Sequence, residues 1–159
     1  MTSPSRFVAI LMGSDSDLPT MQATADVLAQ FGIRYELNIK SAHRTPAAAQ
    51  AYVVDAERRG GAVFIAAAGL AAHLAGFVAG HTLRPVIGVP MEGGPLQGMD
   101  ALLSTVQMPG GIPVACVAIG KAGAKNAAYL AAQMMSLDDP ALAQALREER
   151  QANAEKILE

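Results

Sequence analysis

The sequence predicts an α/β fold, in which a parallel sheet forms the middle layer of a three-layer, doubly wound domain. Five short apolar runs are separated by longer segments with the periodicity of helices. Strands that are apolar on both faces are typical of parallel sheets covered by helices on both sides. With 159 residues, the chain has room for one domain with a substantial core. We expect that single domain over residues 1–159, with its core at about 6–136 and a C-terminal helix at about 140–157.

The first strand is expected at Phe7 to Met12, an apolar run that ends in the polar segment 13–17. A helix follows and stops at Gly32, since glycine is common just beyond a helix end. The helical spacing is carried by Leu18, Met21, Ala25 and Leu28. The second strand is expected at Tyr35 to Lys40. The next helix begins at Pro46, because proline suits the first helical turn, and runs to about Arg59.

The second half of the chain continues the alternation. Its expected elements are a strand at Ala62 to Ala68, a short helix ending near His81, a strand at Pro85 to Val89, a loop at Met91 to Met99, a helix near Asp100 to Val106, a strand at Val114 to Ile119 and an alanine-rich helix at Ala122 to Met135. A last helix starts around Pro140. Its apolar stripe through Leu142 and Leu146 weakens in the charged stretch 147–150, which fits a helix that contacts another subunit and equally fits a solvated terminal helix.

Right-handed crossovers between these strands favour a flavodoxin-like sheet with the strand order 2-1-3-4-5. Ligands of such sheets bind beyond the carboxyl ends of the strands, at the switch point between the first and third strands. The polar loops after the first three strands all reach that point. We therefore expect the functional site there.

The loop after the second strand, Ser41 to Pro46, is the most informative stretch of the chain. His43 supplies an imidazole that can move protons near neutral pH. Arg44 supplies a guanidinium that can hold a phosphate by two parallel hydrogen bonds. The alternative is a surface turn in which Ser41 or Thr45 caps the next helix and His43 is incidental. The position of Arg44 beside His43 at the expected ligand crevice favours a functional role.

The other two loops are less specific. The segment Gly13-Ser14-Asp15-Ser16-Asp17 offers hydroxyls and carboxylates at a helix start, which suits an anion or ribose hydroxyls and equally suits simple N-capping. The third loop, residues 66–74, is small and apolar around His73. Taken alone, this loop favours tight packing with His73 bonded to a backbone group. His81 is expected at a helix end, without a catalytic role.

Composition excludes several classes of function. A net charge of −2 and 4% aromatic residues leave neither the basic field nor the stacking platforms that nucleic-acid binding needs. No run approaches a membrane span, and Met1 to Arg6 lacks the features of a signal peptide, so we expect a cytoplasmic protein. The single cysteine, Cys116, is expected in the core. Alanine-rich helices and only 16% charged residues favour a homo-oligomer.

Several common chemistries have no motif here. There is no metal-ligand spacing, no serine nucleophile elbow, no Walker phosphate loop and no dinucleotide fingerprint in the sequence. The remaining candidate features are one histidine that could act as acid and base, a clamp for a phosphate group and a small pocket without water.

The chain resembles a known enzyme family in four motifs. They are Gly-Ser-Asp-Ser-Asp from Gly13, Ser-Ala-His-Arg-Thr-Pro from Ser41, Ala-Ala-His-Leu from Ala71 and Val-Gln-Met-Pro-Gly-Gly-Ile-Pro-Val from Val106. Together they are similar to the catalytic subunit of phosphoribosylaminoimidazole carboxylase, and most to its bacterial mutase branch. The resemblance implies a flavodoxin-like homo-octamer with sites at subunit junctions and no ATP, metal or organic cofactor. It also implies a mutase of purine biosynthesis that moves a carboxylate of 5-(carboxyamino)imidazole ribonucleotide from the exocyclic nitrogen to ring carbon 4.

The resemblance also assigns the site residues. His43 would be the general acid and base. The ribose 5-phosphate part of the substrate would be bound by Ser14, Asp17 and Arg44, with Ser16 and Ser41 nearby, and the base and carboxylate pocket would be lined by Gly69, His73 and Leu74. No metal ligands are implied.

Three departures from the family pattern and two alternatives accompany this assignment. In the third loop, Ala67 and Leu70 replace glycines of the family pattern, and Ala75 replaces a proline. The sister carboxylase, which uses free carbon dioxide directly, usually has Lys-Gly-Pro where this chain has Arg44-Thr45-Pro46, which argues for the mutase. A flavodoxin-like nucleotide-binding module without catalysis would have no use for His43 beside Arg44.

Overall fold

The computed structural model describes residues 5–158 and contains a five-stranded parallel sheet in the order β2-β1-β3-β4-β5, as predicted. Most of the N-terminal stretch considered for a signal peptide, residues 1–4, lies outside the described range, as does residue 159. The strands are β1 (Phe7–Met12), β2 (Tyr35–Ile39), β3 (Gly61–Ala68), β4 (Val86–Pro90) and β5 (Ala115–Cys116). The helices are α1 (Leu18–Gln30), α2 (Pro46–Arg58), α3 (Leu74–Ala79), α4 (Met99–Val106), α5 (Lys121–Met135) and α6 (Pro140–Leu158), with short 3-10 turns η1 (Asp15–Asp17) and η2 (Ser136–Asp138).

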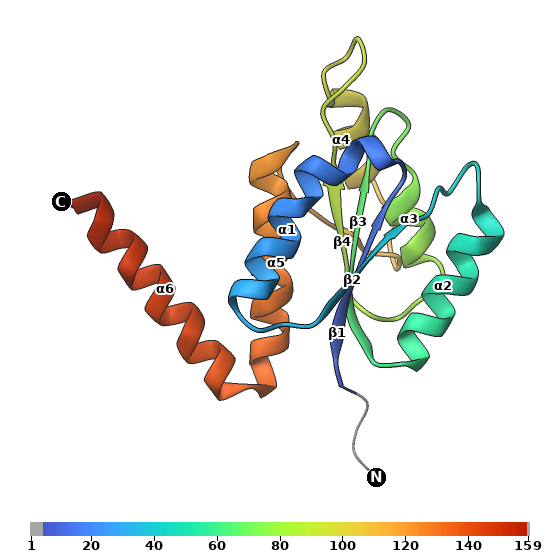
Figure 1. The fold of residues 1–159 in the computed structure, drawn as a ribbon. Helices are drawn as coiled ribbons and strands as arrows, with labels where there is room; N and C mark the ends of the chain where they lie inside the picture. The colour runs from blue at the N-terminus through green and yellow to red at the C-terminus, as the bar shows by residue number, and fades with distance from the viewer. Residues whose placement is uncertain (1–4, 159) are drawn as a thin grey trace.

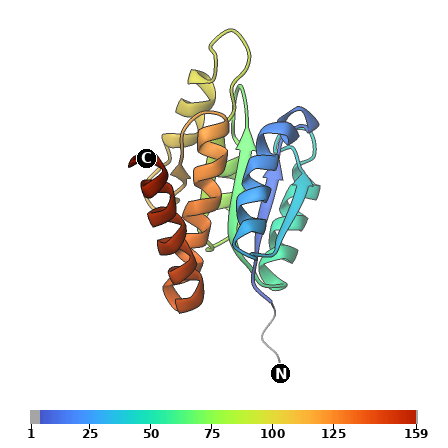
Figure 2. The same cartoon turned by 60° about the vertical axis from the view of Figure 1, so that its left-hand side comes forward.

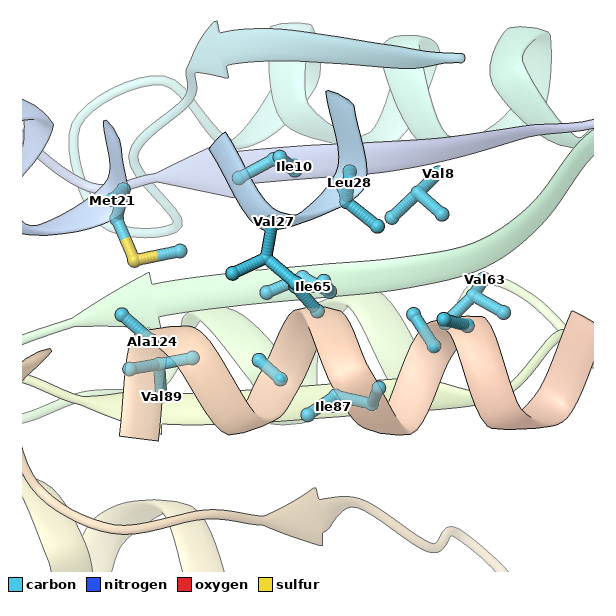
Figure 3. Packing of buried hydrophobic residues seen from close by; sticks show 14 of the residues in the cluster. Val8, Ile10, Met21, Val27, Leu28, Val63, Ile65, Ile87, Val89 and Ala124 are labelled. Atoms are coloured by element: carbon cyan, nitrogen blue, oxygen red, sulfur yellow. The ribbon is translucent and has the colours of Figure 1, made fainter. Parts of the chain in front are cut away.

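Helices cover both faces of the sheet (Figure 1). Successive residues of a strand point to opposite faces of the sheet, so a single strand such as β1 contributes side chains to the core on both faces. Val8 and Ile10 pack with α1 and α5, as Figure 3 shows, whereas Phe7 and Leu11 pack with α2 and α3. Burial on both faces explains why β1, β3 and β4 are apolar almost throughout.

Alanines allow α5 to lie close to both the sheet and α1. The fully buried face of α5 consists of Ala124, Ala127, Ala128, Ala131 and Ala132. The buried hydroxyl of Thr24 in α1 donates a hydrogen bond of 2.7 Å to the carbonyl of Ala124. This bond satisfies the one buried polar side chain that α1 carries into this contact and fixes the start of α5 against α1.

The fifth strand is shorter than the expected Val114 to Ile119. β5 pairs with β4 only through Ala115 and Cys116, and the chain then turns toward α5 at Gly120. The expectation of a core cysteine was wrong, because β5 has a neighbour on one side only and Cys116 is only half-buried. Partial burial raises the pKa of its thiol.

The last helix, α6, leaves the domain body at an angle (Figure 1). Its first half is attached, since Leu142 is buried and Glu149 accepts hydrogen bonds from Tyr129 (2.6 Å) and Gln30 (2.7 Å). From Gln151 onward its described residues are exposed. The apolar stripe therefore ends where the sequence pattern weakens.

Candidate active site

A cavity of about 670 Å³ lies at the carboxyl ends of the strands, where the loops after β1, β2, β3 and β4 meet. All the residues expected at the site line it, which places the candidates from three separate loops in one hollow. They are Ser14, Ser16, Asp17, Ser41, His43, Arg44, Gly69, His73 and Leu74. Strand order explains this convergence, because β1 lies between β2 and β3 and all three strands point the same way.

The first loop combines capping with a polar cavity wall. The hydroxyl of Ser14 accepts hydrogen bonds from the backbone N–H of Ser16 (3.3 Å) and from its hydroxyl (3.1 Å), so Ser14 is the cap of η1. The capping interpretation is therefore right, and the same side chains also face the cavity.

Asp17 is the partly buried carboxyl group of this wall. Burial raises its pKa above the ordinary value of 3.8, and the negative charge of Asp15 adds to the rise. A backbone hydrogen bond at Ser14 opposes both effects. A carboxylate in such a position gains from hydroxyl donors, which a bound ribose would supply.

The second loop is held by its own hydroxyl groups. Thr45 donates a hydrogen bond to the carbonyl of Ser41 (3.1 Å) and accepts one from the N–H of Ser41 (2.9 Å). The hydroxyl of Ser41 accepts the N–H of Arg44 at 3.0 Å. Pro46 then begins α2 with its preset backbone angle. These bonds fix the direction in which His43 and Arg44 leave the backbone.

The two histidines of the site contact each other. Nε2 of His43 and Nδ1 of His73 lie 2.7 Å apart, with the rings nearly perpendicular at 85°. One of these nitrogens donates and the other accepts, so the contact holds one hydrogen between the two imidazoles. The expectation that His73 bonds to a backbone group was wrong for this nitrogen, because folding brings the side chain of His43 to it from a different loop.

Arg44 is anchored by one of its nitrogens and free to use the others. Its Nη2 donates a hydrogen bond of 2.8 Å to the carbonyl of Gly13. Among residues 5–158 no carboxylate lies within ion-pair distance of this guanidinium. Its remaining donors are therefore available for an anion, and the anchor on Gly13 points them at the cavity between the first two loops.

Two of the three departures from the family pattern, Ala75 and Leu70, differ in their structural consequences. Ala75 lies in the first turn of α3 and is buried against the sheet, a position that proline and alanine both tolerate. Leu70 has a φ of 55°, in the left-handed region where glycine is favoured. Such a backbone costs a non-glycine residue about 1–2 kcal/mol.

The sequence interpretation missed the contribution of the loop after β4. Glu92, Gly93 and Gly94 line the cavity, and the carboxylate of Glu92 lies over Gly120 at the start of α5. A charged residue followed by two glycines, one residue beyond a buried strand, was the available signal. It was overlooked because only the first three loops flank the switch point of the sheet.

The described residues contain neither a metal-binding cluster nor a membrane-spanning helix. No three or more His, Cys, Asp or Glu side chains within 5–158 are placed so that they could hold a metal ion. None of the helices in that range combines the length and apolar content that a bilayer-spanning segment requires.

Comparisons with known proteins agree over nearly the whole chain. The AIR carboxylase family model matches residues 7–156. The chain is 51% identical to the N5-carboxyaminoimidazole ribonucleotide mutase of Thermotoga maritima, over 96% of this chain and 88% of the relative. It is 48% identical to the mutase of the same name from Escherichia coli K12, over 99% of this chain and 92% of the relative.

Solved structures show the same similarity. The crystal structure of Treponema denticola PurE superposes with a TM-score of 0.87 at 35% identity, covering 96% of this chain and 94% of that one. The crystal structure of a variant of Treponema denticola PurE2 superposes with a TM-score of 0.88 at 34% identity and the same coverage.

Proposed function

The chain belongs to the AIR carboxylase family, and we propose that it is a mutase that converts 5-(carboxyamino)imidazole ribonucleotide into 4-carboxy-5-aminoimidazole ribonucleotide. Relatives about half identical to it over nearly their full length carry the mutase name. The observation that carries the proposal is the hydrogen-bonded pair of His43 and His73 beside the anchored Arg44, in one cavity. This arrangement offers a proton carrier and a phosphate clamp to the same ligand.

The substrate would be held at its ribose 5-phosphate end by the first two loops. Free donors of Arg44 would bind the phosphate, and the carboxylate of Asp17 would accept hydrogen bonds from the ribose hydroxyls. Ser14 and Ser16 add hydroxyls to the same wall, and Ser41 holds the turn that carries Arg44. The imidazole base then extends toward the third loop, where Gly69 and Leu74 leave room for it.

His43 would transfer one proton in each direction. As an acid it protonates the carbamate nitrogen, so that the nitrogen–carbon bond breaks and carbon dioxide leaves the aminoimidazole. Carbon 4 of the ring then attacks the retained carbon dioxide, which is fast because the two reactants stay together. His43, now neutral, takes the proton from carbon 4 and restores the aromatic ring. No net proton is consumed, and a single group that titrates near neutral pH serves both steps.

His73 would keep the ring of His43 in a fixed orientation through these two transfers. The 2.7 Å bond restrains rotation of the imidazole, and it engages only one of the two ring nitrogens of His43. An orienting partner of this kind is common for a histidine that acts as acid and base.

The working enzyme would be a cytoplasmic homo-oligomer, for which we propose the octamer implied by the family resemblance. An exposed apolar stripe with helical spacing supports association. It runs along the start and outer face of α4, where Leu96, Met99, Leu103 and Val106 are 61%, 53%, 52% and 45% exposed. A second copy of the chain would bury this stripe, and the projecting half of α6 offers another contact.

The decisive experiment follows the ultraviolet change when the purified protein meets the carbamate substrate without ATP. We expect turnover by the natural protein and its loss in His43→Asn, with substrate binding retained, because an amide cannot transfer the proton. A parallel reaction from aminoimidazole ribonucleotide plus bicarbonate separates the mutase from a direct carboxylase. Near-normal activity of His43→Asn would contradict the proposal, as would activity only in the parallel reaction.

A further inference from the structure

The loops after β3 and β4 leave the sheet at the same end (Figures 1 and 2). Residues of both loops line the cavity. Where they leave the sheet, the N–H of Met91 donates a hydrogen bond of 2.9 Å to the carbonyl of Ala68. Gly69 lies directly against Met91, since a Cβ at Gly69 would be 3.6 Å from the Cβ of Met91. Backbone contacts therefore join the two loops at their base.

At the rim of the cavity the contact depends on one side chain. Leu70 projects from the β3–α3 loop with its backbone in the left-handed region, and it is 55% exposed although it lines the cavity. Its Cδ2 atom lies only 2.6 Å from the place that a Cβ on Gly94 would occupy. The end of the Leu70 side chain therefore lies against the β4–α4 loop at Gly94, in space that a larger residue at position 94 would share.

We propose that Leu70 and Gly94 form an apolar clasp, which holds the β4–α4 loop over the cavity and retains the carbon dioxide released during the reaction. The retention rests on the proposed function, whereas the clasp rests on geometry alone. A leucine in a strained backbone conformation, with half of its surface exposed, contributes little to the core. Its contact with the facing loop is the gain that the structure shows for that strain.

The chemistry supplies a use for such a clasp. Carbon dioxide is small, uncharged and poorly held by hydrogen bonds, so its retention depends on apolar walls that close the exit. Each molecule that escapes leaves aminoimidazole ribonucleotide in place of product. Leu70 and Gly94 line the same cavity as His43 and His73, so the clasp lies at the hollow of the proposed acid–base pair.

The clasp is tested by a double-mutant cycle in thermal unfolding of the full chain. Gly94→Ala alone should lower Tm, because its new methyl group meets Leu70 and its φ of 66° is strained for alanine. In the Leu70→Ala background only the backbone strain remains, so the same substitution should lower Tm by less. If Gly94→Ala lowers Tm equally in the natural protein and in Leu70→Ala, the clasp is overturned.

Retention is tested with labelled bicarbonate present during turnover of the unlabelled carbamate substrate. Label enters the product only when released carbon dioxide exchanges with solvent. In Leu70→Ala we expect labelled product and free aminoimidazole ribonucleotide to rise roughly fivefold, the factor for about 1 kcal/mol in the barrier to escape. The matched control is Leu83→Ala, a leucine that is 100% exposed and does not line the cavity, which should leave the leak unchanged.

The outcomes of the two tests are separable. If Leu70→Ala still turns over and its product carries no more label than that of the natural protein, the proposed retention of carbon dioxide is overturned. Absence of turnover in the natural protein would overturn the proposed function and retention with it, while the clasp would still stand or fall by the Tm cycle.

Discussion

The contact between His43 and His73 makes the sharpest prediction about catalysis. The change is His73→Ala, which removes the one side-chain hydrogen bond that residues 5–158 give to the His43 ring. The net worth of a neutral hydrogen bond is about 0.5–1.5 kcal/mol, and bonds to a charged group reach about 1.5–3 kcal/mol. His43 alternates between these two states during the proposed cycle. Loss of the bond should therefore lower kcat about 10-fold, and by no more than about 100-fold.

The assay is the ultraviolet measurement of kcat and KM with the carbamate substrate, applied to four variants. His43→Asn should lose far more activity, since acid–base transfer contributes about 100- to 10,000-fold. If His73 acts only through His43, the double variant should be no slower than His43→Asn alone. His81→Ala is the matched control, because Nδ1 of His81 bonds at 2.7 Å to the carbonyl of Phe77 within its own segment. It should leave kcat unchanged.

Two results would refute this reasoning. A kcat of His73→Ala equal to that of the natural protein would show that the contact does not orient the catalytic ring. Losses that multiply in the double variant would show that His73 acts on the substrate independently of His43.

Two further predictions concern carboxyl groups. Because burial raises the pKa of Asp17, the folded state binds its proton more tightly than the unfolded state, so its ionisation lowers stability as pH rises above 3.8. Asp17→Asn should raise Tm of the unliganded protein at pH 7 and raise KM; an unchanged Tm would contradict this. The pKa of Glu36 is lowered chiefly by the hydrogen bond from Arg59. The ionised Glu36 carboxylate therefore stabilises the fold above about pH 4.5, and this stabilisation is lost in acid. Glu36→Gln should lower Tm at pH 7 and progressively less below pH 4.5, and a pH-independent difference would exclude this linkage.

Much of the fold was predictable from local pattern. Apolar runs such as Phe7 to Met12 identify β1, β3 and β4 because these strands are buried on both faces, and Gly32 and Pro46 mark helix boundaries by their backbone preferences. The β5 edge of the sheet was less predictable. The apolar run that contains Cys116 has the pattern of a central strand, but its pairing depends on a neighbour that is distant in sequence.

The site divides in the same way. The sequence by itself determined which chemical groups are present, because an imidazole, a guanidinium and hydroxyls keep their reactivity wherever they lie. It also determined which loops carry these groups. The handedness of the crossovers favours the strand order that brings those loops to one end of the sheet. Only the tertiary structure decided which groups meet: His43 with His73, Arg44 with Gly13, and Leu70 with Gly94. Each contact joins different loops over distances of a few ångströms, which depend on packing of the whole sheet and not on any local preference.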